Sequence, residues 1–211
     1  MSVVSKRPFD RFTPDSYRVD GEVPHDAPVY IVAALSMRER AQFRGAVALA
    51  GLRYPQDPEL LRALRSVVAE IGPDNADALQ ADIQAFEDLL AAPDAPVPPG
   101  DGETDEARAG READVTRRQA VATAFEVLID LLRAHPAVAH ILSLRTVFLE
   151  TAPLLASAAA LRGWERVDVP FRRVSGVVPD EVLEALPEAD VRAIGARAMA
   201  LFNVSREQAG N

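Results

Sequence analysis

The sequence predicts a mainly α-helical protein, made of helical bundle-like units with a small N-terminal β-hairpin element and a short extended segment near residues 164–171. Hydrophobic residues make up 48% of the chain and aromatic residues only 6%, so the core must consist mostly of Ala, Leu and Val. Ala and Leu favour helices. Apolar residues also recur at i, i+3, i+4 and i+7 in several segments, which is the period of an amphipathic helix. A chain of 211 residues has room for one well-packed domain or two small ones.

The first 35 residues predict the β element. They are rich in the turn-forming residues Pro and Gly. The stretch SYRVDGEV has an Asp-Gly pair between β-forming residues, which is a hairpin signal. PVYIVAAL is a short apolar run that is typical of a strand. We therefore expect two or three short strands in this region.

Three helices are expected next, the last of them covering residues 75–91. Ser36 and Glu39 have the spacing of a capping box, in which each residue binds the backbone amide of the other, and Gly51 is a natural end for this first helix. Asp57 is expected to be the N-cap of the second helix, with Pro58 as its first helical residue. An apolar stripe then indicates the buried face of that helix.

A change of composition divides the chain. Residues 92–112 are acidic and rich in Pro and Gly, without an apolar period, so they predict a linker between domains at 1–91 and 113–211. The C-terminal domain is expected to contain helices at 114–134 and 136–162, the second kinked or broken near Pro153. The extended segment, a short helix in PDEVLEALP and a last helix in EADVRAIGARAMALFNVS follow.

The chemistry-bearing residues match no catalytic or metal-binding motif. The chain has no Cys, and His135 and His140 are five residues apart, whereas two zinc ligands on a helix are four apart. No G-x-S-x-G, P-loop or dinucleotide-binding glycine motif occurs. We therefore expect a non-enzymatic protein with no metal and no cofactor.

The charge of the chain disfavours two classes of partner. The formal net charge is −9, whereas nucleic-acid binders present a basic surface, so no nucleic acid is expected. Arg38, Arg40 and Arg44 nevertheless leave a helix-turn-helix DNA-binding regulator as an alternative. No signal peptide is evident at the N-terminus. The longest apolar run, residues 140–161, contains Arg145 and Glu150, so a soluble helix is expected and no membrane span.

Two long stretches resemble bacteriophage tail assembly chaperones of the siphovirus type. The first is PVYIVAALSMRERAQFRGAVALAGLRYPQDPELLRALRSVVAEI, in which an extended segment leads into a helix with an R-E-R-x-x-F run, a Gly-and-Tyr turn and a Leu-rich helix. The second is the C-terminal stretch from residue 161, with its Gly-Trp pair, V-P-F, Leu-Pro step, final helix and Gly-Asn end. The resemblance covers about two thirds of the chain.

The resemblance implies a function in viral morphogenesis. A chaperone of this family binds the tape measure protein, keeps it soluble and helps to recruit tail tube subunits, so the tape measure and tail tube proteins are the expected partners. It acts in the cytoplasm of the host bacterium and is absent from the mature virion. A structural tail or head-tail joining protein retained in the virion is an alternative, and a homo-oligomer is left open.

Client binding of this kind needs apolar surfaces that accept amphipathic helices. Aromatic and other large apolar side chains are favoured at protein interfaces. The client-binding candidates are Met37, Phe43, Trp164, Phe171, Leu201 and Phe202. Trp164 has a second interpretation, as a cap on the core of the C-terminal helices.

Overall fold

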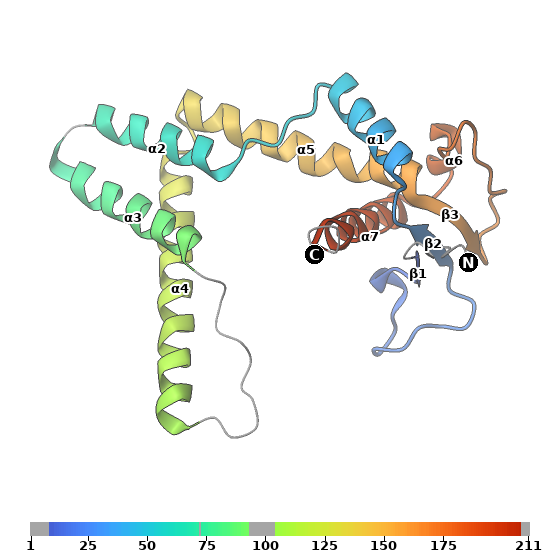
Figure 1. Cartoon of the computed structure of the whole chain (residues 1–211), viewed down its shortest axis with the longest axis horizontal. Coiled ribbons are helices and arrows are strands. Elements are labelled where there is room, and N and C mark those ends of the chain that lie inside the picture. Colours follow the sequence, from blue (N-terminus) through green and yellow to red (C-terminus); the bar gives the residue numbers. More distant parts are fainter. Residues whose placement is uncertain (1–8, 72, 93–103, 208–211) are drawn as a thin grey trace, which may run out of the picture. The chain divides into compact units, whose positions relative to one another are not determined.

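The protein is mainly α-helical, as predicted, with one small antiparallel sheet (Figure 1). The computed structural model describes residues 9–71, 73–92 and 104–207. Its elements in chain order are β1 (Phe9–Phe12), the 3-10 helix η1 (Asp15–Tyr17), β2 (Val29–Ala33), α1 (Met37–Leu49), α2 (Asp57–Ile71), α3 (Pro73–Ala91), α4 (Asp105–Leu132), α5 (Pro136–Ala160), β3 (Leu161–Glu165), α6 (Asp180–Leu183) and α7 (Glu188–Glu207).

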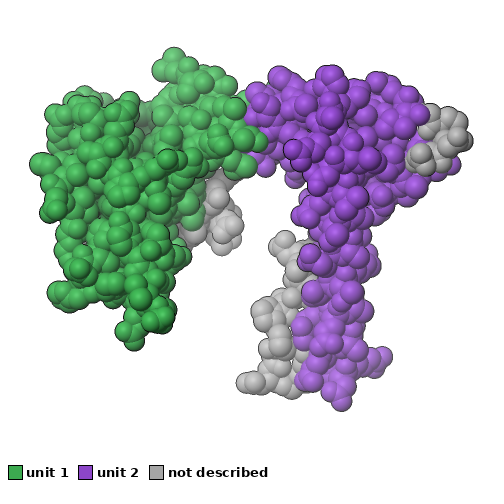
Figure 2. Space-filling view, turned by 180° about the vertical axis from the view of Figure 1, so that it is seen from behind, with its two compact units in different colours: residues 1–53, 146–211 green, residues 54–145 purple. Residues whose placement is uncertain are grey.

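The chain forms two compact units, coloured separately in Figure 2. Unit 1 combines residues 1–53 with 146–211, and unit 2 consists of residues 54–145. The predicted domains, 1–91 and 113–211, do not coincide with these units. The reason is that β2 pairs with β3, which brings the two ends of the chain into one sheet. Such long-range pairing has no signature in local composition.

Helix α4 begins inside the predicted linker. Thr104 is its N-cap, and the Thr104 hydroxyl accepts a hydrogen bond from the Ala107 amide at 3.2 Å. Two acidic residues occupy the first turn, where the helix dipole favours negative charge. The linker prediction is therefore wrong for residues 104–112, and the helix expected at 114–134 runs from 105 to 132. Residues 93–103 lie outside the described residues.

The sheet of unit 1 has the order β1-β2-β3, with both pairs antiparallel. The run PVYIVAAL forms a strand, as predicted, and this strand, β2, is the central one. The Asp-Gly pair of SYRVDGEV does form a tight turn, with φ of 53° at Asp20 and 84° at Gly21, but only one bridge closes it, between Val19 and Glu22. The predicted hairpin is thus replaced by β1 and β2. The extended segment near 164–171 is a strand only up to Glu165.

Helix α5 is continuous through Pro153, where a kink or break was expected. Its C-terminal half packs closely on α7. A Cβ atom added at Gly195 of α7 would lie 2.3 Å from the carbonyl oxygen of Pro153. Ser157 Oγ lies 2.9 Å from the carbonyl oxygens of both Pro153 and Val191. Its hydroxyl proton is shared between these two acceptors, so this hydrogen bond links α5 to α7. Small residues therefore set how closely α5 and α7 approach.

The capping chemistry predicted for α1 is confirmed. The Ser36 side chain accepts from the Glu39 amide at 3.2 Å, and the Ser36 amide donates to the Glu39 carboxylate at 2.8 Å. At the other end, the Gly51 amide donates to Ala48 and the Leu52 amide to Val47, with Gly51 at a φ of 67°. This is a Schellman motif, which satisfies the last carbonyl groups of the helix.

Asp57 is the first residue of α2 and not its N-cap. Its carboxylate accepts a hydrogen bond from Arg145 Nη2 of α5 at 2.8 Å. Arg145 Nε also donates to the Pro55 carbonyl at 2.9 Å, and the guanidinium lies 5.1 Å from the centre of the Tyr54 ring. Arg145 therefore fixes the segment that leads into α2 to the N-terminal half of α5, all within unit 2.

The core of unit 2 joins α2, α3, α4 and the start of α5. The apolar stripe of α2 is buried, and Phe86 of α3 stacks on Phe125 of α4 with ring centres 3.6 Å apart. The buried members of this cluster are Leu60, Leu61, Leu64, Val67, Val68, Ile83, Phe125, Leu128, Leu132 and Val138. Unit 2 is thus a helical bundle, which agrees with the predicted fold class.

Candidate functional site

Two neighbouring clefts in unit 1 form the candidate site. The first, of about 320 Å³, lies between α1, α5 and the segment that leads into α6. It is lined by Glu39, Gln42, Phe43, Ala46, Leu155, Ala158, Ala159, Gly176, Val177, Val178, Pro179 and Asp180. The second, of about 450 Å³, lies between α5, α6 and the start of α7. It is lined by Thr151, Leu154, Leu155, Ala158, Asp180, Leu183, Glu184, Leu186, Glu188 and Val191.

The two clefts share the α5 residues Leu155 and Ala158 and the α6 residue Asp180, so we describe them together as the α5 groove. Figure 1 shows α1 and α6 beside the C-terminal half of α5. From Thr151 to Ala159 the floor rises about 1.5 Å per residue, which gives a length of about 12 Å. Two turns of a partner helix match this length.

Small residues on α5 make the groove hollow. Ala158 and Ala159 bring only a methyl group to the floor, whereas larger side chains would fill the space. The wall next to α6 is held in place by the Val178 amide, which donates to the Ala158 carbonyl at 2.9 Å. Before it, Ser175 and Gly176 have φ values of 52° and 88° in a tight turn, which leaves Val177 on the surface.

The rim of the groove is acidic. Four of its lining residues are acids, namely Glu39, Asp180, Glu184 and Glu188, and none is Lys, Arg or His. Glu39 pairs with Arg162 at 2.9 Å, and Glu188 pairs with Arg192 at 2.8 Å. Asp180 and Glu184 are exposed and form no ion pair among the described residues. The groove therefore combines an apolar floor with negative charge along the α6 side.

Arginines also close the end of α5 that leads into β3. Strand β3 follows α5 without a loop, so the last carbonyl groups of the helix need donors from elsewhere. Arg162 donates to the Ala159 carbonyl at 2.7 Å, and Arg173 donates to Ala159 and Leu161 at 3.1 and 2.9 Å. Burial lowers the pKa of Arg173, while nearby Glu39 raises it. These hydrogen bonds hold the C-terminal end of α5 in place at this end of the groove.

The predicted client-binding residues all belong to unit 1 but occupy different environments. Met37 is 83% exposed at the start of α1. Phe43 lines the first cleft, and its ring packs edge-on against that of Phe202 with centres 5.3 Å apart. Leu201 is partly buried against the core that surrounds the sheet. Met37 is therefore the exposed candidate, and Phe43 is the candidate that lines the groove.

Trp164 and Phe171 are partly buried and pack together against the core that surrounds the sheet. Their rings meet edge-on with centres 5.0 Å apart, and Trp164 makes a similar contact with Tyr30 at 6.4 Å. Trp164 Nε1 donates to the Val169 carbonyl at 2.8 Å. This environment agrees with the interpretation of Trp164 as a core cap, while client binding by the pair stays a prediction.

Sequence reasoning missed most of the groove. Leu154, Leu155 and Leu183 were not singled out, although they contribute much of its apolar lining. A signal existed in TAPLLASAAA, where both faces of one helix are apolar. Packing against one core covers only one face of a helix, so a helix that is apolar on all sides needs a second partner for its other apolar face. The predicted candidates were chosen for aromatic or large side chains instead.

The arginine-rich helix that suggested DNA binding has partly structural roles. Arg40 Nε donates to the Leu35 carbonyl at 3.0 Å, whereas Arg38 and Arg44 are exposed. Helices α1 and α2 belong to different compact units. In a helix-turn-helix the two helices pack as one unit. The DNA-binding alternative therefore gains no support from the described fold.

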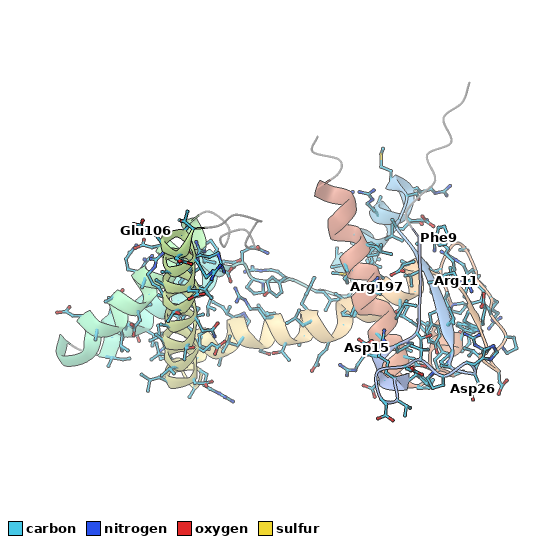
Figure 3. All side chains as sticks on the ribbon, turned by 90° about the horizontal axis from the view of Figure 1, so that it is seen from below. Phe9, Arg11, Asp15, Asp26, Glu106 and Arg197 are labelled. Carbon is cyan, nitrogen blue, oxygen red and sulfur yellow. The ribbon has the colours of Figure 1, made fainter. Side chains whose placement is uncertain are left out.

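A buried polar cluster joins the N-terminal segment to α7. Asp190 is 1% exposed, and its Oδ2 accepts hydrogen bonds from the Tyr17 hydroxyl at 2.9 Å and the Tyr30 hydroxyl at 2.6 Å. Burial and the nearby carboxylate raise the pKa of both tyrosines. Nearby, Arg197 of α7, labelled in Figure 3, pairs with Asp10 of β1. These contacts have an evident structural role, because they connect sheet and helix.

The described residues contain no group of three or more His, Cys, Asp or Glu placed to hold a metal ion. One helix, α5, is long and apolar enough to cross a membrane by length and composition. The same helix carries Arg145, bound to Asp57, and its residues Ala152, Ala156 and Ala160 are buried in unit 1.

The resemblance to tail assembly chaperones rests on the motifs quoted above. The chain matches no protein-family model, and no curated protein or solved structure is significantly similar to it.

Proposed function

We propose that this protein is a phage tail assembly chaperone that binds the tape measure protein, keeps it soluble and helps to recruit tail tube subunits. The observation that carries the proposal is the α5 groove, because it is apolar, solvent-open and about as long as two turns of a partner helix. The residue patterns that resemble this chaperone family point in the same direction. The protein acts in the host cytoplasm and is left out of the finished particle.

Helix recognition explains why a groove suits this task. A long helical client exposes an apolar stripe before assembly, and such stripes cause aggregation when they are left uncovered. An amphipathic helix buries its apolar face in a groove through residues at i, i+3, i+4 and i+7. The net charge of −9 keeps the complex soluble by repulsion between copies. Shielding of one client segment needs no catalysis.

The groove offers a matched pair of variants on one helix. Leu154 lines the second cleft and is 41% exposed, whereas Leu149 is 60% exposed on the same helix and lines neither cleft. We expect Leu154→Asp to abolish solubilisation, because a charge in the groove must be desolvated when the client binds. Leu149→Asp should leave solubilisation unchanged. Both side chains are already substantially exposed, so both variants should fold.

The assay is co-expression of each variant with the tape measure protein, which is the proposed client. The soluble fraction of that protein after centrifugation is the readout, and the intrinsic fluorescence of Trp164 checks folding. The proposal is contradicted if both variants lower the soluble fraction of the client equally, or if neither variant lowers it. Mass spectrometry of purified particles tests the virion-retained alternative, since a stoichiometric amount of this chain in particles would favour a structural tail protein.

A further inference from the structure

The charge on the groove is one-sided, and this asymmetry restricts the partner. Asp180 is the first residue of α6 and Glu184 is its C-cap; they are four residues apart in helical backbone, so they lie on one side of it. Both are exposed and form no ion pair among the described residues. The other two acids of the lining, Glu39 and Glu188, are already paired with Arg162 and Arg192. The groove thus presents uncompensated negative charge beside α6.

We propose that the α5 groove binds an amphipathic helix whose apolar stripe is flanked on one side by Lys or Arg residues one turn apart. This inference rests on the proposed function and specifies the client segment. Two cations spaced i, i+4 on the partner would match the spacing of Asp180 and Glu184. An acidic flank would meet like charge there, which costs binding energy and selects against that partner.

The dimensions of the groove define the rest of the motif. Its floor of about 12 Å takes about two helical turns, which present apolar residues at i, i+3, i+4 and i+7. Leu154, Leu155 and Val177 supply the apolar contacts. Because the two acids without an ion pair among the described residues, Asp180 and Glu184, lie on the α6 side, the cations must follow one edge of the stripe. The partner helix therefore binds in one orientation around its own axis.

The test uses two labelled helical peptides that share leucines at i, i+3, i+4 and i+7. One carries two lysines on a single edge of the stripe, and the other carries glutamates at the same positions. Fluorescence anisotropy with the full chain should show tighter binding of the lysine peptide by about tenfold or more at low salt, and a smaller preference at high salt. Equal binding of both peptides would overturn the charge inference.

Variants of the chain separate the groove from its overall charge. Asp180→Asn combined with Glu184→Lys changes the net charge by +3, and it should weaken binding of the lysine peptide by about tenfold. The control combines Glu112→Lys with Glu126→Gln on α4 of unit 2, which gives the same change of net charge at exposed sites. It should have little effect. Similar weakening by both double variants would show non-specific attraction to an acidic protein and refute the site.

The outcome also distinguishes this inference from the proposed function. If the rim double variant still solubilises the client while Leu154→Asp does not, the groove binds the client but the charge of the rim does not select it. If neither changes client solubility and the peptides still discriminate, the groove binds basic helices and the chaperone function fails. A circular dichroism spectrum of each variant confirms that the helices are intact.

Discussion

The close approach of α5 and α7 makes Gly195 the described glycine with the least room for a side chain. A Cβ at Gly195 would lie 2.3 Å from the Pro153 carbonyl oxygen and 2.6 Å from its carbonyl carbon. These neighbours belong mainly to backbone, so a side-chain rotation does not relieve the clash. Ordinary van der Waals contact begins at about 3.4 Å, so the helices must separate by about 1 Å for Gly195→Ala to fit.

The expected cost follows from two opposing effects. Overpacking of a core typically costs about 1–3 kcal/mol, and a backbone clash belongs at the upper end of that range. Alanine favours a helix over glycine by about 1 kcal/mol, which offsets part of the cost. We therefore expect Gly195→Ala to lower the free energy of unfolding by about 2 kcal/mol. At Gly45 of α1 an added Cβ meets nothing within 4 Å, so Gly45→Ala should raise it by about 0.5–1 kcal/mol.

The chain offers a clean assay for this pair of variants. Trp164 is the single tryptophan, and it belongs to the same unit as Gly45 and Gly195. Urea unfolding followed by its fluorescence therefore reports on unit 1, and the midpoints should shift in opposite directions for the two variants. If Gly195→Ala unfolds at the same urea concentration as the unaltered protein or later, the helices are not held by this contact and the packing argument is refuted.

Four further predictions concern hydrogen bonds, pH and packing. Tyr30→Phe should cost about 2 kcal/mol, because Asp190 loses a buried hydrogen bond. The pKa of Tyr30 is raised above its ordinary value of 10.0, so folding keeps its proton bound and stability should fall as pH rises above 10.0. Lys6 is the only lysine, so little lysine titration overlaps with that of Tyr30 in this pH range. The urea midpoint should therefore fall as the pH rises above 10.0, and it should fall less steeply in Tyr30→Phe. Ser36→Ala should cost about 1 kcal/mol in the same urea assay, through loss of the capping box. Phe125→Ala should cost about 3–5 kcal/mol, because it leaves a cavity beside Phe86, and circular dichroism at increasing temperature measures the loss.

The sequence alone determined the elements whose physics is local. The cap of α1 depends on Ser36 and Glu39, three residues apart, and its end depends on Gly51, so a short window contained the whole cause. The apolar stripe of α2 was equally legible, since the period of a helix reveals its buried face. The start of α4 was missed because the acidic composition around Thr104 outweighed its capping signal. Composition and capping are competing local signals, and here the cap prevailed.

Only the tertiary structure decided which segments form a unit and where a surface is left open. Strand β2 pairs with β3 more than a hundred residues later, and that pairing depends on contacts that no local pattern encodes. The α5 groove also depends on tertiary packing. Ala158 and Ala159 line a cleft only because α1 and α6 pack around them and leave the space above these small side chains unfilled. The apolar character of α5 was visible in the sequence, but which face its neighbours cover depends on the packing of the whole unit.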